Sequence, residues 1–137
     1  MTVDRIDAMA RKQFGSSVAV DFVAQLAGGA YNSTYEVRLK AQPSVILRVA
    51  PEPRRQYRSE TEMMRNEATA TPYLAPIGWL LPEIIGIDWS HEIIERDYMW
   101  QSKIEGVPAT RAFRTHGRDA MVPLFTEMGT VTAAVHS

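Results

Sequence analysis

Residues 26–39 read LAGGAYNSTYEVRL, and residues 45–51 read VILRVAP. Apolar and polar side chains alternate over 34–39, which is typical of a strand with one buried face. The paired glycines before this strand, together with the apolar run over 21–26, predict a turn between two strands. A Gln-Pro-Ser turn then leads into a third strand over 45–49. Such short connections favour an antiparallel meander.

Helices and further strands flank this meander. Residues 4–14 place apolar side chains at helical spacing, and Gly15 follows where a helix often ends. Ser59 is a favourable N-cap for a second helix, which must end or kink near Thr71 because Pro72 disfavours helical geometry before it. The remaining pattern predicts strands over 81–87 and 96–104, a polar loop over 116–119 and a last helix from Pro123. We therefore expect an α+β fold: a five-stranded antiparallel sheet with a helix packed on it, plus an N-terminal and a C-terminal helix.

The composition excludes several classes of function. The 137 residues carry 15 basic and 16 acidic side chains, and this balance gives no global attraction to nucleic acid or to an anionic membrane. The absence of cysteine excludes disulfides and thiolate chemistry. No apolar run reaches the roughly 20 residues of a membrane span, and the charged N-terminus is unlike a secretory signal. We expect a cytoplasmic protein that binds neither nucleic acid nor membrane, and no metal site, because the three histidines are dispersed.

A turn rich in glycine is the first candidate for a binding site. Gly28 and Gly29 lie between two predicted strands, where backbone N–H groups can approach a ligand and hold phosphate oxygens. The side chains of Asn32 and Ser33 would add donors to the same turn. Taken alone, the glycine pair favours an ordinary hairpin.

A cation and an acid are the next candidates. Arg48 lies on a strand among aliphatic residues, and a buried cation needs a partner. Glu67 lies in the predicted second helix, where it can meet Arg48 across the junction of sheet and helix. Taken alone, Arg48 is also compatible with a strand arginine that extends its head into water, and Glu67 with a surface glutamate.

The order of these features resembles that of the aminoglycoside phosphotransferase family and, more remotely, that of protein kinases. The resemblance covers residues 18–137. Residues 26–37 are similar to the family's glycine loop, 45–51 to its third strand, and 64–68 to the helix that carries its acid. Residues 81–85 are similar to the entry to its fourth strand, 98–106 to its fifth strand with the adenine hinge, and 128–137 to the helix before its catalytic loop. It implies a kinase-like nucleotide-binding lobe over 1–105, with a hinge loop and the first helix of an otherwise absent second lobe over 106–137.

The resemblance implies a role for each candidate. The glycine turn and its two polar neighbours would cover the phosphates of ATP or GTP, and Arg48 would contact the α- and β-phosphates, oriented by Glu67. The family often has lysine at this strand position, so the charge is kept while reach and geometry differ. The base is implied to lie against three further places in the chain: Ile46, Gln101 and the backbone from Ser102 to Ile104.

The segment that would complete catalysis is not found in this sequence. The family is implied to need a His-Gly-Asp loop with an asparagine five residues after the aspartate, for the acceptor hydroxyl and for magnesium. The asparagines are Asn32 and Asn66 alone, and neither follows an aspartate at that spacing. Residues 116–119 (HGRD) resemble such a loop in spelling only, since they precede the last predicted helix. We expect a lobe that is inactive alone, whose longer parent binds magnesium and a small-molecule hydroxyl acceptor through the missing lobe.

Two other functions stay open. One is a non-catalytic protein-interaction module with a vestigial nucleotide site. Nucleotide titration would distinguish it from a nucleotide-binding lobe. The other is an RNA-binding domain using Arg54, Arg55 and Arg58, which the near-neutral charge disfavours. We also expect apolar surface on the fifth strand and the last helix, which favours self-association.

Overall fold

The computed structural model describes residues 1–27, 31–56 and 62–136. The chain forms two compact units. The first comprises Met1–Thr69 and Pro82–Lys103, and the second comprises Ala70–Leu81 and Ile104–Ser137. The predicted N-cap at Ser59 lies outside the described residues.

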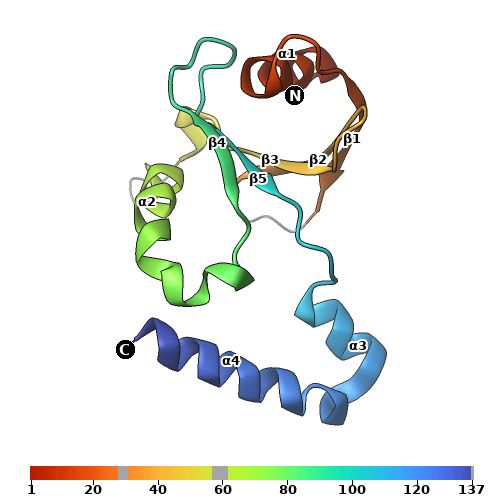
Figure 1. The fold of residues 1–137 in the computed structure, drawn as a ribbon, viewed down its shortest axis with the longest axis vertical. Helices are drawn as coiled ribbons and strands as arrows, with labels where there is room; N and C mark the ends of the chain where they lie inside the picture. The colour runs from red at the N-terminus through yellow and green to blue at the C-terminus, as the bar shows by residue number, and fades with distance from the viewer. Residues whose placement is uncertain (28–30, 57–61, 137) are drawn as a thin grey trace. The chain divides into compact units, whose positions relative to one another are not determined.

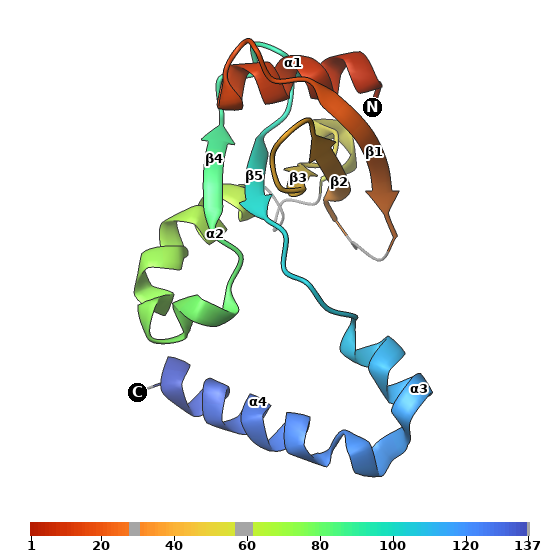
Figure 2. The same cartoon turned by 45° about the vertical axis from the view of Figure 1, so that its right-hand side comes forward.

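A five-stranded antiparallel sheet forms the centre of the first unit, which confirms the predicted fold class (Figure 1). The strand order is β1-β2-β3-β5-β4. Figure 2 shows β4 and β5 side by side with opposite directions. The strands are β1 (Val20–Leu26), β2 (Ser33–Leu39), β3 (Val45–Val49), β4 (Ile84–Asp88) and β5 (Tyr98–Ser102). The last two differ at their ends from the predicted strands over 81–87 and 96–104: β4 begins three residues later and ends one residue later, and β5 is two residues shorter at each end.

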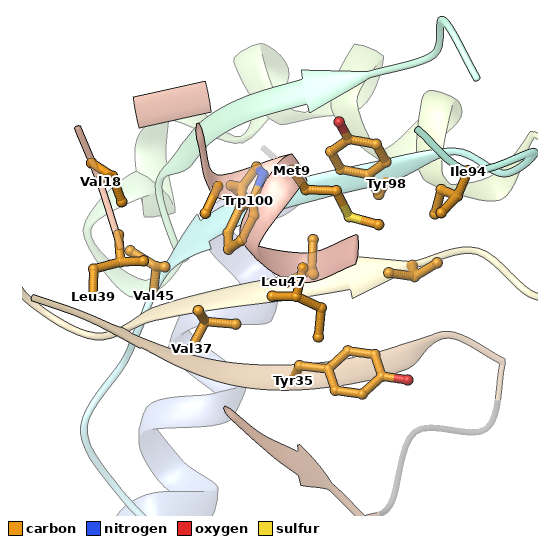
Figure 3. Close-up of a cluster of buried hydrophobic side chains, with 13 residues drawn as sticks. Met9, Val18, Tyr35, Val37, Leu39, Val45, Leu47, Ile94, Tyr98 and Trp100 are labelled. Atoms are coloured by element: carbon orange, nitrogen blue, oxygen red, sulfur yellow. The ribbon is translucent and has the colours of Figure 1, made fainter. Parts of the chain in front are cut away.

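One face of the sheet packs against α1 (Val3–Phe14). The alternating residues of β2 and β3 place Val37 and Leu47 on this face, and neither has exposed surface. Met9 and Trp100 join them, with Trp100 in edge contact with Phe14 at a ring-centroid distance of 5.2 Å. Figure 3 shows Met9, Val37, Leu47 and Trp100 between the helix and the sheet. This cluster is the main hydrophobic core.

The opposite face carries α2 (Met63–Ala70) and a smaller apolar cluster. Met64 is buried there against Ala50 and Met99. Arg48 pairs directly with Met99, and directly paired residues of an antiparallel sheet share a face. The alternation of β3 therefore places the side chain of Leu47 in the main core and that of Arg48 on the opposite face, which α2 covers.

The second unit is helical. It contains the 3₁₀ segment η2 (Thr71–Leu80), α3 (Ala109–Ala120) and α4 (Val122–Val135), and Ile77 and Met121 are buried. The last predicted helix corresponds to α4. The predicted polar loop over 116–119 is wrong, because these residues lie within α3, where Gly117 alone departs from helical geometry with φ 77°.

We expected exposed apolar side chains on both the fifth strand and the last helix, and the structure shows them only on the last helix. On α4, Val122, Phe125 and Met128 are exposed, as expected. On β5 the expectation is wrong, because residues 98–101 are buried between the two helix layers of the first unit. Across residues 1–27, 31–56 and 62–136, none of the helices is long and apolar enough to cross a bilayer.

Candidate functional site

The guanidinium of Arg48 is held by two side chains on the α2 face of the sheet. Its Nη2 donates to Oε2 of Glu67 at 2.8 Å, and its Nη1 donates to Oε1 of the same carboxylate. Nη1 also lies 3.4 Å from Oε1 of Gln101 on the neighbouring strand. Two parallel charge-assisted hydrogen bonds fix the plane of the guanidinium as well as its position. The predicted meeting of Arg48 with Glu67 is confirmed.

Apolar packing places Glu67 above Arg48. Met64 is the buried anchor of α2, and Glu67 and Ala68 follow it at the spacings of three and four that share a helix face. Burying Met64 against the sheet therefore turns Glu67 toward β3. Its partner Arg48 has a side chain 22% exposed, so the pair lies at the margin between core and solvent.

Gln101 is the buried polar residue of the described core, with 4% of its surface exposed. Its Oε1 faces Arg48, and its Nε2 lies 3.5 Å from Oε1 of Glu67. A buried amide is tolerated when its donor and acceptor both find partners. Gln101 therefore completes a three-residue network that supports the guanidinium from the sheet side.

A cavity of about 430 Å³ opens beside this network. Asn32 borders it, as predicted for the end of the glycine turn, and so does Tyr31. Gly28 and Gly29 lie outside the described residues. The cavity is lined by residues of β2, β3, α2 and the β3–α2 and β4–β5 connections, among them Thr34, Arg48, Gln56, Glu67, Arg65, His91, Arg96 and Asp97.

Ser33 and Thr34 lie on opposite faces of the sheet. Ser33 pairs with Val49, whereas Thr34 pairs with Arg48. Because paired residues share a face, the side chain of Ser33 lies on the core face and that of Thr34 on the Arg48 face. The predicted role of Ser33 as a donor of the glycine turn stays a prediction. The two-residue alternation of the strand was the signal that places Thr34 on the Arg48 face.

The residues predicted to surround the base are distributed as follows. Ile46 is half-buried and pairs with Gln101, so both lie on the Arg48 face. The amide N–H of Ser102 donates to the carbonyl oxygen of Glu83 at 2.9 Å, so that donor is already used within the sheet. Ile104 is exposed and belongs to the second unit. The roles of these residues toward a base stay predictions.

A second charged cluster, which the sequence did not indicate, joins α2 to the β4–β5 connection. Nε and Nη2 of Arg65 donate to the two carboxylate oxygens of Asp97 at 2.7 and 3.0 Å. Nε2 of His91 lies 2.8 Å from Oδ1 of Asp97, and the guanidinium of Arg65 lies 5.4 Å from the centre of the Trp89 ring. The hydrogen bonds from Arg65 hold the pKa of Asp97 below its usual value, and burial opposes this shift only in part.

A third cluster joins α1 to the same connection on the other face. Asp88 accepts hydrogen bonds from the Tyr98 hydroxyl and the Ser90 amide, both at 2.7 Å, and forms an ion pair with Lys12. Burial tends to raise the pKa of Asp88, but these hydrogen bonds outweigh it and hold the pKa well below the usual value. Within the described parts of the chain, the acidic and histidine side chains form no group of three or more that could hold a metal ion.

Comparison with known proteins gives one family. Residues 23–137 match the family described as the phosphotransferase enzyme family, APH. A solved structure from Ralstonia eutropha JMP134, assigned as an aminoglycoside phosphotransferase, aligns with 77% of this chain at 13% identity and a TM-score of 0.48. This chain spans 29% of the length of that protein. A search of curated proteins finds no match.

Proposed function

Because the chain belongs to the phosphotransferase enzyme family, we propose that its first unit binds ATP or GTP. The parent reaction would transfer the terminal phosphate to a hydroxyl group of a small molecule. The observation that carries the proposal is the guanidinium of Arg48, which Glu67 and Gln101 fix beside a cavity. A cation held in this way can receive a nucleotide phosphate without first being ordered.

The chemistry of Arg48 suits a phosphate group. A guanidinium has five N–H donors in a planar fork, so it can bind a carboxylate on one side and donate to phosphate oxygens on another. Glu67 neutralises the cation in the absence of ligand, which lowers the cost of holding it half-buried. Donors from Asn32 and Thr34 border the same cavity and would add neutral contacts.

The residues present fit the phosphate part of a nucleotide better than they fit a metal. The described cavity combines three arginines and several neutral donors with four acidic residues, and the acids and histidines among the described residues form no group of three or more that could hold a metal ion. Magnesium, which neutralises the phosphates in such enzymes, would therefore depend on residues outside this chain. We also propose that binding of the hydroxyl acceptor and the transfer step depend on residues outside this chain, because residues 1–137 lack the His-Gly-Asp loop with its asparagine.

Nucleotide titration of the full chain by calorimetry tests the proposal. We expect Arg48→Ala to weaken binding by about 10- to 100-fold, because a hydrogen bond to a charged group contributes about 1.5–3 kcal/mol. Arg38→Ala is the matched control: Arg38 is also a strand arginine paired with an acid, Asp21, and it does not border the cavity. We expect it to leave affinity unchanged.

Two outcomes would contradict nucleotide binding at this site. One is the absence of heat from ATP and GTP at millimolar concentration, which would favour the protein-interaction module with a vestigial site. The other is equal binding by the wild-type chain and Arg48→Ala.

A further inference from the structure

We infer that Asp97 is a positioning residue: by binding Arg65, it sets α2 so that Glu67 reaches Arg48. Its relevance to nucleotide affinity rests on the function proposed above, whereas its effect on the Arg48–Glu67 contact can be measured without any ligand.

Asp97 is tied to three elements at once. It directly precedes β5, and its carbonyl oxygen accepts a hydrogen bond from the amide of Ala50 at 2.9 Å, just after the end of β3. Its carboxylate receives both donors of Arg65 from α2, and Nε2 of His91 from the β4–β5 connection. The side chain is 14% exposed, so the carboxylate is held in place by its surroundings. Asp97 therefore gives α2 a fixed reference point on the sheet.

The helix needs such a reference. With eight residues, α2 is about two turns long, and helices of this length are not stable through their own hydrogen bonds. Its apolar anchor is Met64, a flexible side chain that adapts to small shifts of the helix. A methionine contact alone would therefore allow α2 to rotate or slide by a fraction of a turn.

The planar fork of Arg65 restricts that freedom. A bidentate contact requires the guanidinium and the carboxylate to lie in one plane, which fixes the rotation of the helix that carries it. Arg65 also packs on the ring of Trp89. Glu67 is two positions further along α2 and so projects from a different side of the helix. The orientation that Arg65 gives to the helix therefore also determines the direction of Glu67. The bidentate contact between Glu67 and Arg48 likewise requires the guanidinium and the carboxylate to lie in one plane.

The prediction is that weakening the contact at Asp97 loosens the Arg48–Glu67 contact, although both of its members are unchanged. A double-mutant cycle with Arg48→Met and Glu67→Gln, measured by urea unfolding, gives the coupling between them. We expect a coupling of about threefold or more in the unfolding equilibrium constant of the wild-type chain. In the Asp97→Asn background we expect the coupling to fall to near onefold.

A control background distinguishes a specific effect of Asp97 from the general effect of losing an ion pair at the surface. Asp21→Asn removes the partner of Arg38 at the β1–β2 edge, away from α2, and should leave the Arg48–Glu67 coupling intact. If Asp97→Asn fails to fold, Arg65→Lys serves in its place, because lysine keeps the charge without the fork. An Arg48–Glu67 coupling that is the same in the Asp97→Asn and wild-type backgrounds, or absent from the wild-type chain, overturns the inference.

Nucleotide titration of the same variants distinguishes the two proposals. We expect Asp97→Asn to weaken ATP binding by less than Arg48→Ala does. Loss of coupling without any nucleotide binding by the wild-type chain would reject the proposed function and leave the positioning role standing. If nucleotide binding depends on Arg48 but the Arg48–Glu67 coupling is unchanged in the Asp97→Asn background, only the positioning role is rejected.

Discussion

Replacement of Trp100 tests the packing of the sheet that carries the site. This side chain has no exposed surface, and its ring meets that of Phe14 at 5.2 Å. Among the described residues, its indole Nε1 has no hydrogen-bond partner. Two variants separate the ring from its N–H group: Trp100→Phe removes the donor and keeps an aromatic ring, whereas Trp100→Ala removes both.

The two substitutions should differ widely in stability. Trp100→Ala leaves a cavity in the main core and should cost about 3–5 kcal/mol. For Trp100→Phe two effects oppose each other: loss of the larger ring costs about 1–2 kcal/mol, and removal of a buried unpaired donor returns about 1–3 kcal/mol. We therefore expect the effect of Trp100→Phe to lie between a loss of about 1 kcal/mol and a gain of about 2 kcal/mol in the free energy of unfolding.

Urea unfolding followed by far-ultraviolet circular dichroism measures both variants. Trp79→Phe is the control for loss of an indole, because Trp79 is 80% exposed and its replacement should cost less than about 0.5 kcal/mol. A cost for Trp100→Phe close to that of Trp100→Ala would refute the reasoning, since it would mean that Nε1 is paired in solution.

Two further predictions concern the contacts between α1 and β4. Because the folded state holds the pKa of Asp88 below its ordinary value of about 3.9, its contribution to stability is present above about pH 4 and is lost as the pH falls toward the folded pKa. Asp88→Asn should therefore lower the urea midpoint at pH 7 and flatten its decline between about pH 4 and pH 2, and an unchanged acid profile would contradict this assignment. At Gly86 an added Cβ would lie 2.0 Å from Oε1 of Gln13, whose Nε2 donates to the carbonyl of Ile85, so Gly86→Ala should displace that side chain and cost about 1 kcal/mol. In a Gln13→Ala background the same substitution should cost almost nothing, and an equal cost in both backgrounds would place the strain elsewhere.

The sheet was largely predictable because its strands carry a strong local signal. The third strand was predicted over 45–49, where the structure has β3, and the second begins one residue earlier than predicted. Alternation of apolar and polar residues specifies such strands directly. The α3 helix was missed for the opposite reason: most of its residues are polar, and it contains Gly117, a residue that disfavours the interior of a helix.

The site was predictable where it depends on order along the chain. Arg48 on a strand and Glu67 on the next helix were expected to meet, and they do. The Arg65–Asp97 contact was not expected, because two charged residues 32 positions apart give no periodic signal and each resembles an ordinary surface residue. Only the folded arrangement shows that they share a cavity with Arg48.

The guanidinium at position 48 also determines which covalent reagents can label the cavity beside it. Acyl-phosphate nucleotides label a site by transferring their acyl group to a nearby amine, and a permanently protonated guanidinium is not a nucleophile for that transfer. The sequence has three lysines, Lys12, Lys40 and Lys103, and none is among the described lining residues of the cavity beside Arg48. Profiling by lysine acylation would therefore leave this cavity unmarked, whereas a dicarbonyl reagent selective for guanidinium groups, applied with and without nucleotide, would reveal whether Arg48 is shielded.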